Sequence, residues 1–237
     1  MRVRTPKSWI TPFEVVDRTL VVRFASPRRV ISSGVRGGGI GWAHAIINHQ
    51  VSNTFNCPKN GARRIQQWED PSRTLGKVAG RLGISGRCVG LMTLVDLRQL
   101  VVTREQVGGL WVEGFFTIGV TNAVRAGDPT SDVSQVGTIN MILVTNAKLA
   151  MAALVGAVTV ATESKVAVLF EERIPSSVGT GLATGTGTDS IVIAVGNGQQ
   201  LRYSGTHTKI GELIGRVVAR GTRLGLNRIK GLPSKEE

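Results

Sequence analysis

The stretch ATGTGTDSIVIAVG, residues 183–196, decides the fold, because it joins a loop of alternating glycine and threonine to a short apolar strand. A plain turn needs one glycine or one aspartate, whereas this loop has Gly185, Gly187 and Asp189 together. The two glycines can adopt backbone conformations that are closed to other residues. The loop therefore indicates a backbone shaped to hold a ligand, and an Asx turn at the start of the strand explains Asp189 equally well.

Strands and helices alternate on both sides of this stretch. Runs of β-branched and apolar residues predict strands at 87–95, 110–120, 138–144 and 190–195. Apolar residues three and four apart predict helices at 72–82, from Lys148 to about Glu172, and at 209–221. We therefore expect an α/β or α+β fold, with a mixed sheet and helices packed on it.

The chain contains no segment that resembles a linker, so we expect a single domain over residues 1–237 with a frayed tail from about 231 to 237. Two further predictions concern its first quarter. Ser26 and Pro27 separate two β-branched runs, which predicts a hairpin within 19–33. Ile40, Ala43 and Ile47 recur at helical spacing after a triple glycine, which predicts a helix.

Composition restricts the location and the partners of the protein. The formal net charge is +13, but the cations are scattered along the sequence. Tyr203 is the only tyrosine, so the chain has few aromatic side chains on which nucleic-acid bases could stack. We expect a solvated basic surface and no nucleic-acid partner; nucleic-acid binding would show a steep dependence on salt. Two cysteines form no disulfide framework, and the first residues lack the apolar core of a secretory signal, so we expect a cytoplasmic protein.

The most apolar stretch, LAMAALVGAVTVAT at 149–162, lies between Lys148 and Glu163. It is shorter than the ~20 residues that cross a bilayer. We expect a buried helix here and no membrane partner.

A first cluster of candidate site residues lies in SSGVRGGGIGWAHAIINHQV, residues 32–51. Its glycines would let a helix N-terminus approach a ligand closely. On the predicted helix Asn48 lies one turn beyond His44, so both would face the same ligand. A tight turn explains the glycines about as well.

A second cluster is the glycine and threonine loop itself, where Thr184, Thr186 and Thr188 offer hydroxyl groups. The loop is no phosphate-binding P-loop, because no Gly-Lys-Ser/Thr follows and it leads into a strand. A third cluster is YSGTHTKIGE at 203–212, in which His207 precedes a helix that carries Glu212. A loop histidine suits a general acid or base, since its ordinary pKa lies near working pH; a structural role is the alternative.

The sequence has no zinc-type spacing of cysteine and histidine and no nucleophile elbow of the Gly-x-Ser-x-Gly type. We therefore identify no protein metal site and predict no serine hydrolase of the common type. Assistance by a metal is left open, because His44, His49, Asp189 and His207 could meet in space. The cofactor is left unknown.

The motifs together resemble the adenosylcobinamide amidohydrolase family of corrinoid salvage. The resemblance rests on ATGTGTDSIVIAVG followed by YSGTHTKIGELIGRVV, and on ISSGVRGGG, GLMTLVD, VGTINMILV and ATESKVAVLFE. It covers residues from about 20 to 221. Members hydrolyse the amide that joins the aminopropanol arm of adenosylcobinamide to a propionate of the corrin ring, which yields adenosylcobyric acid for coenzyme B12 synthesis. The resemblance thus implies a cytoplasmic amidohydrolase with a corrinoid substrate, whose cobalt belongs to the substrate.

Within that resemblance we predict His207 as the group that moves the proton, oriented by Asp189 or Glu212. Backbone N–H groups of the glycine and threonine loop would hold the carbonyl oxygen or a nearby corrin amide. The predicted substrate-binding residues are Ser33, Gly38, Gly39, Asn48, Thr184, Gly185, Thr186, Gly187, Thr188, Thr206 and Thr208. A corrinoid- or nucleotide-binding protein without catalysis is the alternative, and a homo-oligomer is left open.

Overall fold

The computed structural model describes residues 3–4, 11–51, 70–130 and 137–230, which contain a nine-stranded mixed sheet. Seven strands follow one another in the order β1 (Val3–Arg4), β2 (Phe13–Val16), β3 (Thr19–Ser32), β12 (Ser190–Ala194), β9 (Ile139–Thr145), β7 (Leu110–Ile118) and β6 (Val101–Val107). Off this path β4 (Gly39–Gln50) pairs with β3 and with β5 (Cys88–Thr93). Two of the pairs, β12 with β9 and β4 with β5, are parallel. The predicted mixed sheet with packed helices is confirmed.

Strand β3 is continuous where the sequence predicted a hairpin. Its pairing with β4 shifts register between Arg23 and Arg28, which marks an irregularity around Ser26 and Pro27. A bulge bends and twists a strand without reversing it, and proline is tolerated there because it has no N–H to leave unpaired. The hairpin prediction is wrong, and the irregularity lets the first part of β3 pair with β2 and the last part with β12.

Strand β4 replaces the helix predicted for the same residues. Its neighbouring residues Ala45, Ile46 and Ile47 are all buried. Ile46 belongs to one core cluster, whereas Ala45 and Ile47 belong to another. A strand buried on both faces loses the alternation of apolar and polar residues that identifies a strand in sequence. The predicted helix is therefore wrong.

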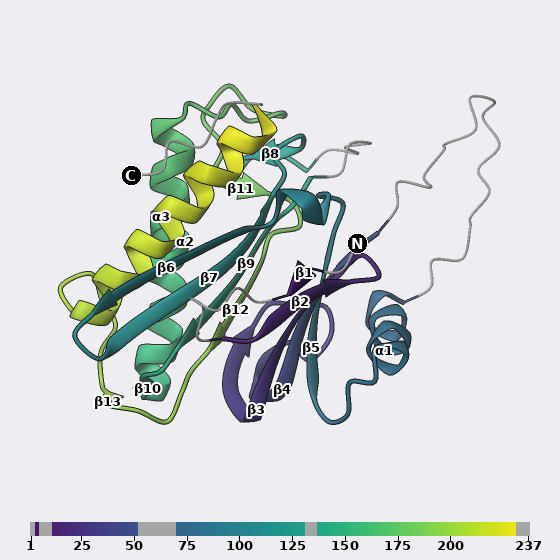
Figure 1. Cartoon of the computed structure of the whole chain (residues 1–237). Coiled ribbons are helices and arrows are strands. Elements are labelled where there is room, and N and C mark those ends of the chain that lie inside the picture. Colours follow the sequence, from purple (N-terminus) through teal and green to yellow (C-terminus); the bar gives the residue numbers. More distant parts are fainter. Residues whose placement is uncertain (1–2, 5–10, 52–69, 131–136, 231–237) are drawn as a thin grey trace.

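Within the described part of the chain three helices cover the sheet: α1 (Pro71–Arg81), α2 (Met151–Glu171) and α3 (Lys209–Ile229). Figure 1 shows α3 in yellow crossing β6 and β7, with α2 beside it, and α1 at the opposite side of the molecule. Helix α1 is capped by the side chain of Asp70, which accepts a hydrogen bond from the backbone N–H of Ser72. The helix thus begins one residue before the predicted start at residue 72, and Gly83 follows its end with a φ of 62°.

Two short strand pairs and a 3-10 turn complete the described elements: β8 (Ala123–Val124) with β11 (Gly185–Thr186), β10 (Lys148–Leu149) with β13 (Gln200–Leu201), and η1 (Leu97–Gln99). Helix α2 begins three residues after the predicted Lys148, because Lys148 and Leu149 pair with β13 instead. Strand β11 precedes β12 and β13 follows it, so the two small pairs lie at opposite ends of β12 (Figure 1).

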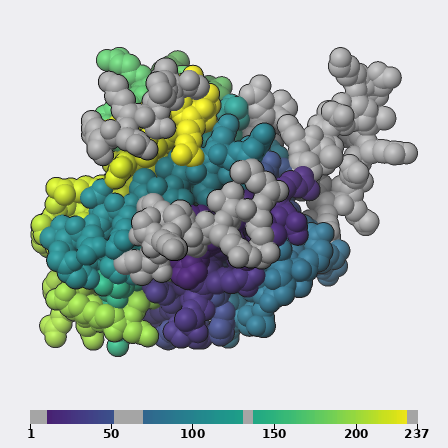
Figure 2. All heavy atoms as spheres, viewed as in Figure 1, coloured from purple at the N-terminus to yellow at the C-terminus, as the bar shows by residue number. Residues whose placement is uncertain are grey.

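Among the described residues the core consists of three apolar clusters on successive layers. One lies between the sheet and helices α2 and α3, and one lies under α1. The middle cluster joins β2, β3, β4 and β5 to β7, β9 and β12, and there the rings of Phe13 and Phe115 meet edge to face at 5.1 Å. In the space-filling view the purple N-terminal strands lie directly against the teal middle of the chain (Figure 2). The sheet is therefore folded on itself.

Helix α2 differs from a fully buried core helix. Within the described residues it is long and apolar enough to cross a membrane by length and composition alone, and 44% of its most apolar window is buried. Core helices of soluble proteins pass the same test. The prediction of a buried helix holds for one face of α2, and the opposite face is exposed.

Candidate functional site

The glycine and threonine loop, residues 183–189, lies at the N-terminal end of β12, toward the top of Figure 1. Its residues Gly185 and Thr186 pair with β8. The backbone N–H of Thr184 donates to the carbonyl of Val124, and the Thr184 hydroxyl accepts from the N–H of Ala126. The predicted loop is therefore fixed to the segment that follows β7.

Asp189 forms an ion pair with Lys165 at this end of β12. The Nζ atom of Lys165 lies 2.6 Å from Oδ2 of Asp189, and the side chains are 8% and 18% exposed. Oδ1 of Asp189 accepts from the Thr186 hydroxyl at 2.5 Å and from the N–H of Ile139 at 3.0 Å. Removing two charges from water is costly, and these additional hydrogen bonds offset part of that cost.

Gly185 lies directly against this ion pair. A Cβ atom at position 185 would lie 2.4 Å from Oδ2 of Asp189 and 2.7 Å from Nζ of Lys165, closer than carbon and a polar atom can approach. A Cβ at Gly187 would have no atom within 4 Å. The two glycines of the motif therefore have different requirements, and only Gly185 is enforced by packing.

Two threonines connect the loop to the start of β9. The hydroxyl of Thr188 donates to the carbonyl of Gly137, and the hydroxyl of Thr138 donates to the carbonyl of Thr188, each at 2.9 Å. This reciprocal pair holds the residues before β9 and before β12 side by side. Parallel strands make that possible, since their N-terminal ends meet at one edge of the sheet.

Asn48 belongs to a buried polar network next to these residues. Its Nδ2 donates to the Thr117 hydroxyl and its Oδ1 accepts from Nδ2 of Asn140, both at 3.0 Å. Asn140 also donates to the carbonyl of Met92, so the network joins β4, β5, β7 and β9. Asn48 is 2% exposed, whereas His44 is exposed near Gly86. The expectation that both face one ligand from a helix is therefore wrong.

The glycine-rich loop at 33–38 reaches the same end of β12. Ser33 exchanges hydrogen bonds with Ile191, through its N–H and through its hydroxyl, each at 3.0 Å. Arg36 exchanges backbone hydrogen bonds with Gly90 of β5. A Cβ at Gly38 would lie 2.6 Å from the carbonyl of Gly34, and Gly39 has a φ of 89°. The first two predicted clusters thus converge, although they are 150 residues apart.

The third predicted cluster lies elsewhere. The hydroxyl of Ser204 donates to the carbonyl of Ala153 near the start of α2, whereas Lys165 holds Asp189 twelve residues further along that helix. At a rise of 1.5 Å per residue these two points are about 18 Å apart. His207 follows Ser204 and is exposed, and no hydrogen bond to its ring is formed by the described part of the chain. The predicted pairing of His207 with Asp189 is therefore wrong.

Glu212 does not orient His207 either. Its carboxylate contacts Lys209 at 2.6 Å and Arg216 at 2.8 Å on the exposed side of α3. The hydrogen bond from Lys209 holds the pKa of Glu212 below its ordinary value, helped by Arg216. Thr208 caps α3 by accepting from the N–H of Gly211, and Thr206 is exposed. Thr208 and Glu212 thus stabilise the N-terminal end of α3.

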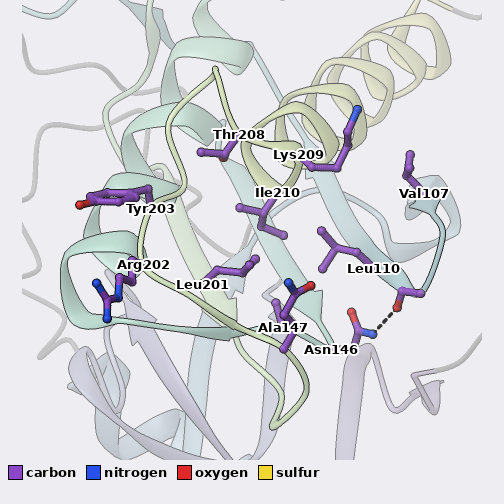
Figure 3. A pocket seen from close by; sticks show the side chains of 12 residues that line it. Val107, Leu110, Asn146, Ala147, Leu201, Arg202, Tyr203, Thr208, Lys209 and Ile210 are labelled. Carbon is purple, nitrogen blue, oxygen red and sulfur yellow. Dashed lines mark hydrogen bonds between the residues drawn. The ribbon is translucent and has the colours of Figure 1, made fainter.

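A pocket of about 550 Å³ lies beside this start of α3 (Figure 3). Leu110, Ala147, Leu201 and Ile210 form its apolar centre, and Asn146 lies at its edge with a hydrogen bond to the carbonyl of Gly109. Figure 3 shows the side chains of Arg202 and Tyr203 pointing away from that centre. The pocket is thus apolar at its centre, and Asn146, Gln199, Thr208 and Lys209 are among the polar residues that line it.

The described residues include no group of three or more histidine, cysteine, aspartate or glutamate side chains that would hold a metal. His49 is buried, and its Nδ1 lies 2.8 Å from the hydroxyl of Thr19. Burial lowers the pKa of His49, with further lowering by Arg18 and Arg81.

Lys165 is a site residue that the sequence analysis did not identify, as are Thr117, Thr138 and Asn140. It is buried on the face of α2 that also buries Ala161, Val168 and Leu169. A lysine within an apolar stripe requires a buried partner, because an isolated ammonium group is too costly to bury. The position of Lys165 within that apolar stripe was the signal in the sequence for a buried ion pair, and the structure shows Asp189 as the partner.

Comparison with known proteins agrees with the motifs. A family model described as adenosylcobinamide amidohydrolase matches residues 8–234. An uncharacterized protein of Methanocaldococcus jannaschii is 30% identical over 86% of this chain and 83% of its own length. A protein of Methanosarcina mazei named adenosylcobinamide amidohydrolase is 29% identical over 90% of this chain and 96% of its own length.

Proposed function

Because this chain belongs to the adenosylcobinamide amidohydrolase family, we propose that it hydrolyses the amide between the aminopropanol arm and the corrin ring of adenosylcobinamide. Water adds to the amide carbon, the carbon–nitrogen bond breaks, and the products are adenosylcobyric acid and aminopropanol. The observation that carries the choice of site is the Lys165–Asp189 ion pair, where two widely separated glycine-rich motifs meet.

The ion pair supplies two of the groups that amide hydrolysis needs. The ammonium of Lys165 has three N–H donors, one of which is directed at Asp189, and in a largely buried setting it stabilises negative charge that develops on the carbonyl oxygen. The carboxylate of Asp189 is 18% exposed, so it accepts a proton from an attacking water at the surface of the site. Lys165 then provides the proton for the departing amine.

The surrounding residues position this pair. Thr186 and the N–H of Ile139 fix one oxygen of Asp189, and Gly185 leaves the space that the second oxygen and Lys165 occupy. Groups held in this way need little reorganisation during the reaction. The threonine hydroxyls and Ser33 at the same end of β12 are suited to a corrin edge, which carries many amides.

The test is incubation of the purified protein with adenosylcobinamide, followed by mass analysis of the corrinoid and of released amine. We expect adenosylcobyric acid and aminopropanol in equal amounts. Glu163→Gln is a matched control on α2, since Glu163 is exposed two residues from Lys165. Recovery of unchanged adenosylcobinamide from folded wild-type protein would contradict the proposal.

Corrinoid binding without hydrolysis is the second candidate, and one observation favours it. Asp189 already accepts three hydrogen bonds, which is the pattern of a carboxylate that holds a loop in place. A binding protein would retain adenosylcobinamide through gel filtration and release it chemically intact. Product analysis therefore separates the two functions.

A further inference from the structure

Thr138 lies where the hydrogen-bond ladder between β9 and β12 ends. The two strands pair in parallel from Asn140 and Ser190 onward. Before these residues side chains replace the backbone ladder, because the Thr138 hydroxyl donates to the carbonyl of Thr188 at 2.9 Å. Thr138 is 4% exposed, and a buried hydroxyl group needs such a partner. The hydroxyl therefore contacts the glycine and threonine loop from inside the protein and does not reach a substrate.

Asp189 takes the place of a backbone acceptor at the same point. Its Oδ1 accepts from the N–H of Ile139 at 3.0 Å. In a continued parallel ladder this N–H would donate to a backbone carbonyl of the neighbouring strand. Here the carbonyl of Thr188 accepts from the Thr138 hydroxyl instead, and the N–H of Ile139 donates to the carboxylate. The direction of the Asp189 side chain therefore depends on how β9 begins.

A third hydrogen bond runs in the opposite direction and is anchored. The Thr188 hydroxyl donates to the carbonyl of Gly137 at 2.9 Å. The N–H of Gly137 donates to Oδ1 of Asn122 at 2.9 Å, and a Cβ at Gly137 would lie 2.6 Å from that oxygen. We call the three bonds the Thr138 clamp: Thr138 to Thr188, Thr188 to Gly137, and Ile139 to Asp189. The clamp thus ties the loop to a support that is itself held by Asn122.

We propose that Thr138 is a positioning residue for the amide hydrolysis, acting on Asp189 through the carbonyl of Thr188. The inference rests on the proposed function, in which the Asp189 carboxylate accepts a proton from water. Oδ2 of Asp189 is held by Lys165, whereas Oδ1 is held by the Thr186 hydroxyl and by the clamp. A displacement of about 1 Å can lower the rate on the order of 10²-fold. Thr138 thus keeps the carboxylate in the direction that the reaction needs.

Thr145 lies at the other end of β9 and offers a matched control. It is 2% exposed, and its hydroxyl donates to the carbonyl of Trp111 at 2.7 Å. Residue type, strand, burial and kind of hydrogen bond are therefore the same as for Thr138. At a rise of ~3.3 Å per residue the two threonines lie about 23 Å apart along the strand. A purely structural role of Thr138 predicts the same behaviour for both.

The first test compares kcat and KM for adenosylcobinamide, together with the melting temperature, among Thr138→Val, Thr138→Ser and Thr145→Val in the full chain. Valine keeps the shape of threonine and removes the hydroxyl, so both valine variants should lose a similar amount of stability. We expect Thr138→Val to lose at least about 10-fold in kcat with KM within about twofold of wild type. Thr138→Ser should recover most of that rate, and Thr145→Val should keep the wild-type kcat.

Two results of this comparison overturn the proposal. Equal kcat values for Thr138→Val and Thr145→Val would show that Thr138 contributes to stability alone. A rise in KM with an unchanged kcat would show that the hydroxyl contacts the substrate.

The second test needs no substrate, because it follows hydrogen exchange of the Ile139 amide by NMR. We expect Thr138→Val to speed this exchange by about fivefold or more and Thr145→Val to leave it unchanged. Unchanged exchange in Thr138→Val overturns the proposal, whatever the turnover. A wild-type protein without turnover, in which Thr138→Val still speeds the exchange, would contradict the proposed function and leave the clamp in place.

Discussion

The two ends of β12 carry the two motifs by which the sequence resembles its family, and they are built differently. At the N-terminal end, polar side chains from α2, β4, β9 and the glycine-rich loops bond to one another around the Lys165–Asp189 pair. At the C-terminal end, His207 is exposed, Glu212 pairs with neighbouring cations, and the pocket beside them has an apolar centre. The N-terminal end of β12 thus carries polar side chains that orient one another, whereas the C-terminal end carries the first turn of α3 beside an apolar pocket.

The difference teaches that a motif rich in polar residues does not by itself indicate catalysis. What distinguishes the two ends is whether charged groups are withdrawn from water and fixed by several partners. The N-terminal end satisfies that condition, because Lys165 is 8% exposed and Asp189 has three hydrogen-bond donors. The following experiments test the comparison between the ends.

The largest effect is expected from Gly185→Ala. The added methyl group would overlap both Oδ2 of Asp189 and Nζ of Lys165, so one or both side-chain ends must shift and the ion pair is disturbed. Losing a buried pair altogether costs about 3 kcal/mol or more, so the melting temperature of a chain of this size should fall by up to about 10 °C. Gly187→Ala has open space and is the control for stability. Equal melting temperatures for the two variants would remove the packing argument.

A smaller effect is expected for the coupling between Lys165 and Asp189. Lys165→Met leaves the Asp189 carboxylate without its ammonium partner, and Asp189→Asn leaves the ammonium without its carboxylate, so each single change should lower the free energy of unfolding. The double change should lower it by less than the sum of the two single changes. A coupling free energy of about 1–3 kcal/mol is expected from a double-mutant cycle in denaturant. Strict additivity would show that the contact contributes no net stability.

A pH effect on stability is expected from the buried His49. Burial lowers the pKa of His49, so the unfolded chain binds a proton at a higher pH than the folded chain does. The free energy of unfolding should therefore be fully present above pH ~6.5 and fall as the pH drops through the lowered pKa. His49→Gln should flatten this dependence in urea titrations between pH 5 and 7, whereas an unchanged slope would contradict the assignment.

The smallest effect is expected from Glu212→Gln. The carboxylate lies at the surface and its ion pairs are screened by water and salt, so the melting temperature should not change measurably. Turnover should also persist, because Glu212 contacts no group at the N-terminal end of β12. Loss of turnover with an intact fold would move the reaction to the start of α3.

The sequence predicted four strands of the sheet, β5, β7, β9 and β12, and the three described helices, where the local signal was strong. Strands at 110–118 and 139–145 and the helix of α1 follow from β-branched runs and from apolar spacing. The errors occurred where tertiary structure overrode that signal. β4 is buried on both faces, so it shows no alternation, and β3 accommodates Ser26 and Pro27 within a register irregularity.

The site was predictable in part. Ser33 and the glycine and threonine loop were both predicted to bind the substrate, and the contacts with Ile191 bring the two together. The pairing of His207 with Asp189 failed for a reason visible in the sequence. One motif precedes the strand at 190–194 and the other follows it, and the loops before and after one strand lie at its opposite ends. Predicting Lys165 as a site residue would have required knowledge of which face of α2 is buried.

The most direct measurement is the single-turnover rate of aminopropanol release from adenosylcobinamide, compared between Lys165→Met, Asp189→Asn and His207→Ala, with folding checked by circular dichroism. Hydrolysis at the N-terminal end of β12 predicts that the first two variants lose at least about 10²-fold in rate and that His207→Ala stays within a few-fold of wild type. Full activity in Lys165→Met and Asp189→Asn, together with an inactive His207→Ala, would contradict this account.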